Sequence, residues 1–162
     1  MARIDFKASR EMPLPARVVY GVIADYHIGH PAILPKPPFI DLIVEQGGTG
    51  AGTVFRARMK MMGRDTSFRA AVTEPEPGRV LLEKGLDSDL QTFFIVEPLG
   101  GGAGSDAERS RTTFHTIMNV PGLAGLIQKW ITPRLLLPVY HQELANLEAH
   151  AQALWWVEKA KK

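Results

Sequence analysis

The sequence lacks cysteine altogether and has no long hydrophobic run. Without cysteine there are no disulfide bonds, no thiolate metal sites and no cysteine nucleophile, and the composition agrees with a reducing compartment. No stretch reaches the roughly 18 apolar residues of a membrane-spanning helix. The opening residues, MARIDFKASR, alternate polar and apolar side chains and contain no apolar secretion signal. We therefore predict a cytoplasmic protein without a membrane span.

An excess of one charge is also absent, because 19 Lys and Arg residues face 17 Asp and Glu residues, for a net charge of +2. The cations of the central segment are not interleaved with aromatic residues, as a single-stranded nucleic acid would require. We therefore predict no nucleic-acid partner. Instead, Arg56, Arg58, Lys60, Arg69 and Arg111 are expected to pair across strands, on a solvated face, with Glu45, Glu74 and Glu83.

An alternation of polar and apolar residues dominates the chain from Phe39 to Asn119. It forms six runs separated by hairpin-length turns, at residues 39–46, 53–62, 67–72, 79–84, 90–97 and 109–119. Such runs predict half-buried strands, and the short turns predict antiparallel neighbours. Residues 2–12 alternate in the same way and predict a further strand at the sheet edge. The glycine-rich stretch LGGGAGSDAE is expected to be a mobile hairpin loop.

Helical spacing of apolar residues appears on both sides of this region. Residues 16–26 predict a short amphipathic helix, and residues 31–34 a second helical turn. Residues 132–157 predict a long helix, whose N-cap would be Thr132 and whose first position would be Pro133. Pro138 predicts a bend or a later start, and residues 121–131 a separate short helix. One face of the long helix is apolar: Leu136, Tyr140, Leu144, Leu147, Ala151 and Leu154.

These elements together predict an α+β fold in a single domain of residues 1–162. Sequential antiparallel strands with one apolar face curl through their natural twist, and the long helix would cover the concave side. The segments ADYHIGHP, TEPEPGRV and LLLPVYHQELANLEAHA also resemble the polyketide cyclase/dehydrase-like branch of the START and birch-pollen-allergen superfamily. That resemblance implies a helix-grip fold, in which a curved sheet wraps around a C-terminal helix and encloses a hydrophobic cavity.

The resemblance turns the apolar sheet face into a candidate ligand site. Alternation alone favours a solid core filled by the same residues, since every half-buried sheet has such a face. Methionines would give the wall an adaptable lining, and Thr92, Thr116 and Tyr140 would orient the guest. The predicted wall consists of Phe55, Ala57, Met59, Phe68, Ala70, Val72, Leu82, Thr92, Phe94, Phe114, Thr116 and Met118, closed by Leu136, Tyr140 and Leu144.

Three residues are candidates for proton transfer. A buried Tyr140 hydroxyl beside Glu143 would supply the acid and base that a cyclase needs, and His30 would stand at the cavity mouth. The alternatives are a packed tyrosine with a solvated glutamate, and a loop histidine. His27 and His30 have the spacing of metal ligands, but no third ligand is fixed beside them, so no metal or other cofactor is expected.

Three functions remain open at this stage. The first is a carrier that binds a hydrophobic lipid, polyketide or isoprenoid between sheet and helix. The second is a cyclase or dehydratase that uses the same cavity. The third is a scaffold that binds a protein partner, with Trp155 and Trp156 exposed near the C-terminus. The sequence leaves open whether the protein is a monomer or a dimer.

Overall fold

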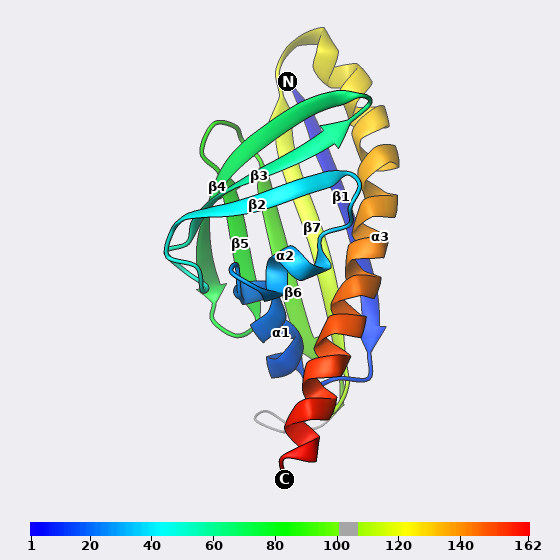
Figure 1. Cartoon of the computed structure of the whole chain (residues 1–162). Coiled ribbons are helices and arrows are strands. Elements are labelled where there is room, and N and C mark those ends of the chain that lie inside the picture. Colours follow the sequence, from blue (N-terminus) through cyan, green and yellow to red (C-terminus); the bar gives the residue numbers. More distant parts are fainter. Residues whose placement is uncertain (101–106) are drawn as a thin grey trace.

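The structure is a computed structural model that describes residues 1–100 and 107–162. In that part of the chain, a strand, two short helices, six strands and a long helix follow one another, as predicted (Figure 1). The strands are β1 (Ala2–Met12), β2 (Phe39–Gln46), β3 (Val54–Met61), β4 (Arg64–Glu76), β5 (Val80–Gly85), β6 (Gln91–Pro98) and β7 (Ser110–Val120). The helices are α1 (Ala16–Ala24), α2 (Gly29–Ile33) and α3 (Gly122–Ala160). Most of the predicted glycine-rich loop, residues 101–106, lies outside the described residues.

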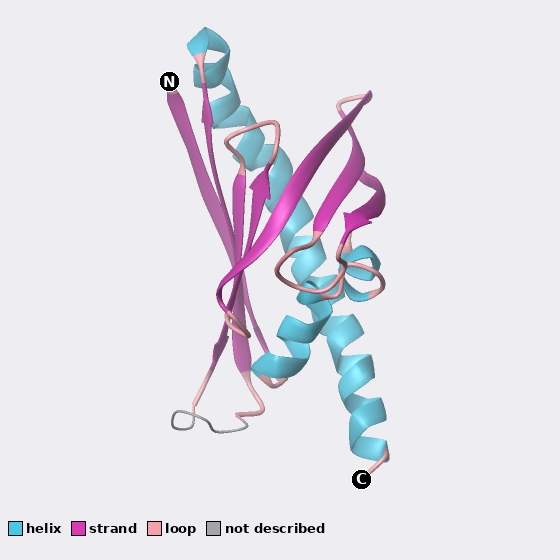
Figure 2. Ribbon diagram, turned by 90° about the vertical axis from the view of Figure 1, so that its left-hand side faces the viewer, coloured by secondary structure: helices cyan, strands magenta, loops and turns pink. Residues whose placement is uncertain are grey.

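The strands form one antiparallel sheet in the order β1-β7-β6-β5-β4-β3-β2. From β2 to β7 each strand pairs with its neighbour in sequence, and β1 joins β7 at the far edge, from Ala2 opposite Val120 to Met12 opposite Ser110. In Figure 2 the sheet is strongly curved, so that β2, β3 and β4 lie on the other side of α3 from β1. This arrangement confirms the predicted helix-grip fold.

Alternation decides which side chains enter the core. In β1, Ile4, Phe6 and Ala8 are buried while their neighbours are exposed. The inward residues of β6 and β7 follow the same rule, as predicted, and Phe114 is completely buried between the ring of Phe94 and α3. The concave face therefore carries the apolar side chains, and α3 lies against it.

The long helix α3 differs from the prediction in where it begins and in how its last turns are buried. It begins at Gly122, not Thr132, and continues without interruption through Pro133 and Pro138. Each proline removes one backbone hydrogen bond, but the helix packs along β1, α1 and α2, and this packing outweighs the local cost. Leu154, predicted to lie on the buried face, is 49% exposed because the last turns of α3 extend beyond the sheet (Figure 1).

Strand β5 presents the opposite face from the one predicted. Leu81 and Glu83 are buried, whereas Leu82 is only partly buried and lies on the other side of the sheet. A register irregularity in β4 between Thr73 and Glu76 precedes β5, and such an irregularity changes which residues of the next strand point inward. The expected surface pairing of Glu83 is therefore wrong.

The predicted strand cations pair with carboxylates, but only Arg56 and Arg69 do so with a predicted partner, Glu45. The others pair elsewhere: Arg58 with Asp41, Lys60 with Asp65 and Arg111 with Glu11. Glu45 accepts hydrogen bonds from Arg69, and Arg56 lies 3.5 Å away. Glu74 is an exception, because it accepts a 2.6 Å hydrogen bond from the Tyr20 hydroxyl. These exposed ion pairs each add little to stability and suit a solvated surface.

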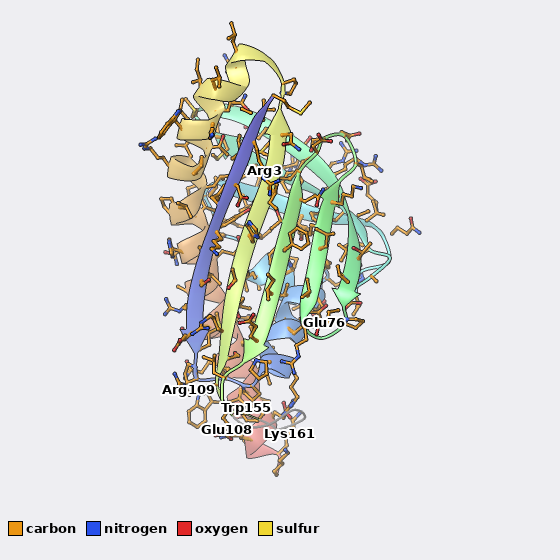
Figure 3. The ribbon with its side chains drawn as sticks, turned by 180° about the vertical axis from the view of Figure 1, so that it is seen from behind. Arg3, Glu76, Glu108, Arg109, Trp155 and Lys161 are labelled. Carbon is orange, nitrogen blue, oxygen red and sulfur yellow. The ribbon has the colours of Figure 1, made fainter. Side chains whose placement is uncertain are left out.

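The two tryptophans near the C-terminus differ from each other. Trp156 is 64% exposed, as predicted, but Trp155 is half-buried and packs against charged side chains. The Arg17 guanidinium lies 5.1 Å from its ring centre and the Lys159 ammonium 5.0 Å. Trp155, labelled in Figure 3, therefore ties the end of α3 to α1.

One glycine in α1 and one in α2 should respond oppositely to replacement by alanine. A Cβ at Gly29 would lie 2.5 Å from the Val22 carbonyl oxygen, whereas nothing lies within 4 Å of one at Gly21. We expect Gly29→Ala to lower the free energy of unfolding by about 2 kcal/mol, because α2 must move away from α1. Gly21→Ala, inside α1, should raise it by about 0.7 kcal/mol. Urea denaturation measures both, and a gain in the Gly29 variant would contradict the close approach.

Candidate functional site

A cavity of about 480 Å³ lies between the concave face of the sheet and α3. Ten of the predicted wall residues line it: Phe55, Ala57, Met59, Phe68, Thr92, Phe94, Thr116, Met118, Leu136 and Tyr140. The cavity is also lined by residues that the sequence did not assign to the wall, among them Leu34, Phe39, Leu42, Met61, Leu90 and Val139. Apolar side chains therefore form most of its surface.

Five predicted wall residues lie elsewhere. Ala70, Val72, Phe114 and Leu144 are buried in the core but do not line the cavity. They point inward as predicted and belong to the packed hydrophobic core. Leu82 lies on the opposite face of β5, for the reason given above. A pattern of alternation identifies the inward face, but it does not tell the packed part of that face from the hollow part.

A cluster of polar groups at one side of the cavity joins α2 to β5. The Tyr26 hydroxyl donates a 2.6 Å hydrogen bond to Glu83 Oε1, and the His30 ring stacks on the Tyr26 ring at 4.6 Å. His30 Nδ1 lies 2.7 Å from the Ile23 carbonyl oxygen, which only accepts, so Nδ1 carries the proton. His30 Nε2 lies 3.7 Å from Glu83 Oε1. The Asp25 carboxylate positions this segment by accepting from the backbone N–H groups of residues 27 and 28.

Burial determines the charges in this cluster. It lowers the pKa of His30 to about 4, against a smaller opposing effect of the hydrogen bond to Ile23. Burial also raises the pKa of Glu83 to about 7, opposed by the hydrogen bond from Tyr26. His30 is therefore neutral near pH 7 and its Nε2 is a proton acceptor. The 3.7 Å approach of His30 Nε2 to Glu83 Oε1 is therefore not an ion pair between two fully charged groups.

Glu143 brings a second carboxyl group into the cavity from α3. It is only 3% exposed and lines the cavity wall, so the solvated glutamate considered from the sequence is wrong. Burial raises the pKa of Glu143 well above its usual value, and the charge of Glu83 raises it further. Burial thus favours the protonated form of Glu143, in a wall that also holds a proton acceptor, His30 Nε2.

The three polar groups predicted to orient a guest form one hydrogen-bonded chain. The Tyr140 hydroxyl lies 2.6 Å from Thr116 Oγ1, which lies 2.9 Å from Thr92 Oγ1. Burial raises the pKa of Tyr140 above its ordinary value, so the phenol keeps its proton. This chain crosses from α3 to β7 and β6, and it gives the apolar wall a polar strip.

Sequence reasoning missed Glu83, the residue that connects the cluster. Its neighbours Val80, Leu81 and Leu82 are all apolar, so the pattern allows either face of β5 to be the buried one. His30 was a candidate and is buried at 3% exposure, but His27 is exposed, so the structure does not bring the two together as ligands. Among the described residues, no group of three or more His, Cys, Asp or Glu side chains is arranged to hold a metal ion.

The sequence identifies the family to which this fold and cavity belong. Residues 3–152 match the family described as polyketide cyclase/dehydrase and lipid transport. The chain belongs to this family. This match confirms the resemblance to the polyketide cyclase/dehydrase-like branch that the sequence indicated. A comparison with curated proteins gave no significant match.

Solved structures support the same assignment of fold. The KanY protein is 25% identical with a TM-score of 0.76, covering 94% of this chain and 99% of that one. The Zhui aromatase/cyclase from a Streptomyces species is 17% identical with a TM-score of 0.73, covering 93% and 94%. A START superfamily protein from Mycobacterium smegmatis is 15% identical with a TM-score of 0.66, covering 93% and 98%. In the described part of the chain, no helix is long and apolar enough to cross a membrane.

Proposed function

We propose that the protein binds a small, mostly apolar molecule in the cavity between the sheet and α3. The observation that carries this proposal is the cavity itself, which has a volume of about 480 Å³ and a largely apolar wall. Sites for small ligands in proteins have this size and this mixture of apolar walls with a few placed polar groups. Lipid, polyketide and isoprenoid molecules have the matching chemistry.

Polar groups inside the cavity would fix the orientation of the guest. The Thr92–Thr116–Tyr140 chain and the Glu83–His30 cluster both border the open space. A fully apolar guest would leave these groups without new partners, and buried polar groups without partners are costly. The ligand is therefore proposed to carry at least one polar group on an apolar body.

A dye-binding experiment with a blocked cavity tests this proposal. Ala57 lines the cavity at 1% exposure, so Ala57→Phe should fill part of the space and weaken binding of the neutral dye prodan by about tenfold or more. Ala71→Phe is the matched control, because Ala71 is on β4 and does not line the cavity. Circular dichroism must show that both variants are folded. Equal dye binding by the wild type and both variants would contradict a cavity site.

An enzyme of the cyclase or dehydratase type is the second candidate. It is favoured by one observation, the presence in one cavity wall of Glu143, whose protonated form burial favours, and of the proton acceptors Glu83 and His30. Such a pair supplies and removes protons on a bound chain. One relative of this fold is an aromatase/cyclase. An enzyme of this kind would need the Glu143 proton for turnover. A carrier has no turnover and would need only to bind its ligand.

A further inference from the structure

The cavity holds an unusual balance of charge-bearing groups. Two carboxyl groups, Glu83 and Glu143, line it, and none of its lining residues in the described part of the chain is Lys or Arg. The other titratable groups that face them are His30 from α2, Tyr26 from the segment after α1 and Tyr140 from α3. All three are neutral near pH 7, because burial disfavours their charged forms.

Glu143 is the group in this cavity that the protein itself leaves without a partner. Glu143 is 3% exposed, and it borders the open space of the cavity. Among the residues that the structure describes, none donates a hydrogen bond or an ion pair to its carboxyl group. Within residues 1–100 and 107–162, the one donor to the Glu83 carboxyl is the Tyr26 hydroxyl, on Oε1. Buried carboxyl groups normally have such partners, so a ligand is the natural source of the missing donor.

We propose that the ligand of this cavity carries a basic amine on an apolar body, and that Glu143 and Glu83 together bind the protonated amine. This inference rests on the proposed ligand-binding function and names the ligand's polar group. An ammonium group placed between the two carboxyls donates the hydrogen bonds that Glu143 lacks. Its positive charge also stabilises the charged form of the carboxyls, which burial otherwise disfavours.

The same groups argue against an anionic ligand. A carboxylate, sulfate or phosphate in this wall would add a third negative or potentially negative group where no Lys or Arg lines the cavity. A neutral alcohol or ketone would bind to the Thr92–Thr116–Tyr140 chain without using the carboxyl pair as a counter-charge. The ranking of ligands by affinity is therefore amine first, alcohol second and carboxylate last.

Three probes that differ in one group test this ranking. Phenylbutylamine, phenylbutanol and phenylbutyrate share an apolar body and should displace prodan from the wild-type protein near neutral pH. We expect the amine to act at about tenfold lower concentration than the alcohol, and the carboxylate to be weakest. In Glu143→Gln the ratio between amine and alcohol should fall to about two. Glu97→Gln, which removes an equal charge from an exposed site on β6, should keep the wild-type ratio.

The outcomes separate this inference from the function on which it rests. If prodan and phenylbutanol bind but phenylbutylamine binds no better, the cavity takes ligands and the amine site is refuted. An amine preference that persists in both Glu143→Gln and Glu83→Gln also refutes the site. If neither prodan nor any of the three probes binds, ligand binding itself is refuted. A lost preference in Glu143→Gln with a retained one in Glu97→Gln supports the amine site.

Discussion

The Glu143→Gln variant should be more stable than the wild-type protein at about pH 8, by about 2 kcal/mol, and equally stable at about pH 4. Glu143 has a folded-state pKa well above its ordinary value of 4.5, because it is buried and lies near Glu83. In the unfolded chain the same carboxyl loses its proton above about pH 4.5. The stability associated with the proton is therefore complete below that pH and is lost as the pH rises. Glutamine has no proton to lose, so the variant avoids this cost.

Other buried groups change with pH in the same range, and their signs differ. The pKa of Glu83 is raised to about 7, so its contribution also falls as the pH rises from 4.5 to about 7. The pKa of His30 is lowered to about 4, so its contribution is present above 6.5 and is lost as the pH falls toward about 4. Because Glu83 and His30 are present in both proteins, the difference between wild type and Glu143→Gln reports mainly the contribution of Glu143.

Urea denaturation from about pH 4 to about pH 8 measures this difference directly. The exposed Glu97→Gln variant is the control and should remain within about 0.5 kcal/mol of the wild type throughout. A Glu143 variant that is less stable than the wild type at every pH would show that the carboxyl has a stabilising partner. A gain at high pH would instead indicate that the protein retains this acid at a cost to stability, as functional residues commonly do.

Replacing Phe114 with alanine should lower the free energy of unfolding by about 4 kcal/mol. Phe114 is fully buried, and its ring packs at 4.7 Å from the Phe94 ring and at 5.9 Å from the Tyr140 ring. Removing it leaves a void between the sheet and α3. The loss therefore combines the lost burial of the ring with the cost of the cavity.

Phe93→Ala is the matched control, because Phe93 lies on β6 next to Phe94 but on the other face, and is only half-buried. Its loss should be about 1.5 kcal/mol or less, since solvent already reaches the ring. Thermal and urea denaturation of the two variants give the comparison. Similar losses in both would mean that the inner face of β6 and β7 is not the better-packed one.

The sequence predicts the fold well and the site only in part, for physical reasons. The strands follow from a strict alternation, as in β1 and β7, where a shift of one residue would reverse every side chain. Strand β5 has no such alternation around Leu81, so its face is set by the irregular pairing of β4. Local signals at Thr132 and Pro133 also suggested a helix start that the packing of α3 overrides.

The polar groups of the cavity were harder to predict than its wall. Glu143 lies at the margin of the apolar face of α3, where helical spacing alone allows either a solvated or a buried side chain. Its burial depends on how far the curved sheet reaches around the helix, which is a property of the whole fold. Glu83 and Glu143 come from elements far apart in sequence, so only the tertiary structure brings their carboxyls into one space.

The pairing of β1 with β7 determines when a ribosome-bound chain can complete its sheet. The two strands are about a hundred residues apart in sequence, yet they match along their whole length. During synthesis β1 emerges about a hundred residues before β7 and lacks this partner until β7 has been made. Contacts of such long range slow folding, and an unpaired alternating strand can associate with other chains. We infer that a chain stopped before β7 would be prone to aggregate, and that the first strand joins the sheet late.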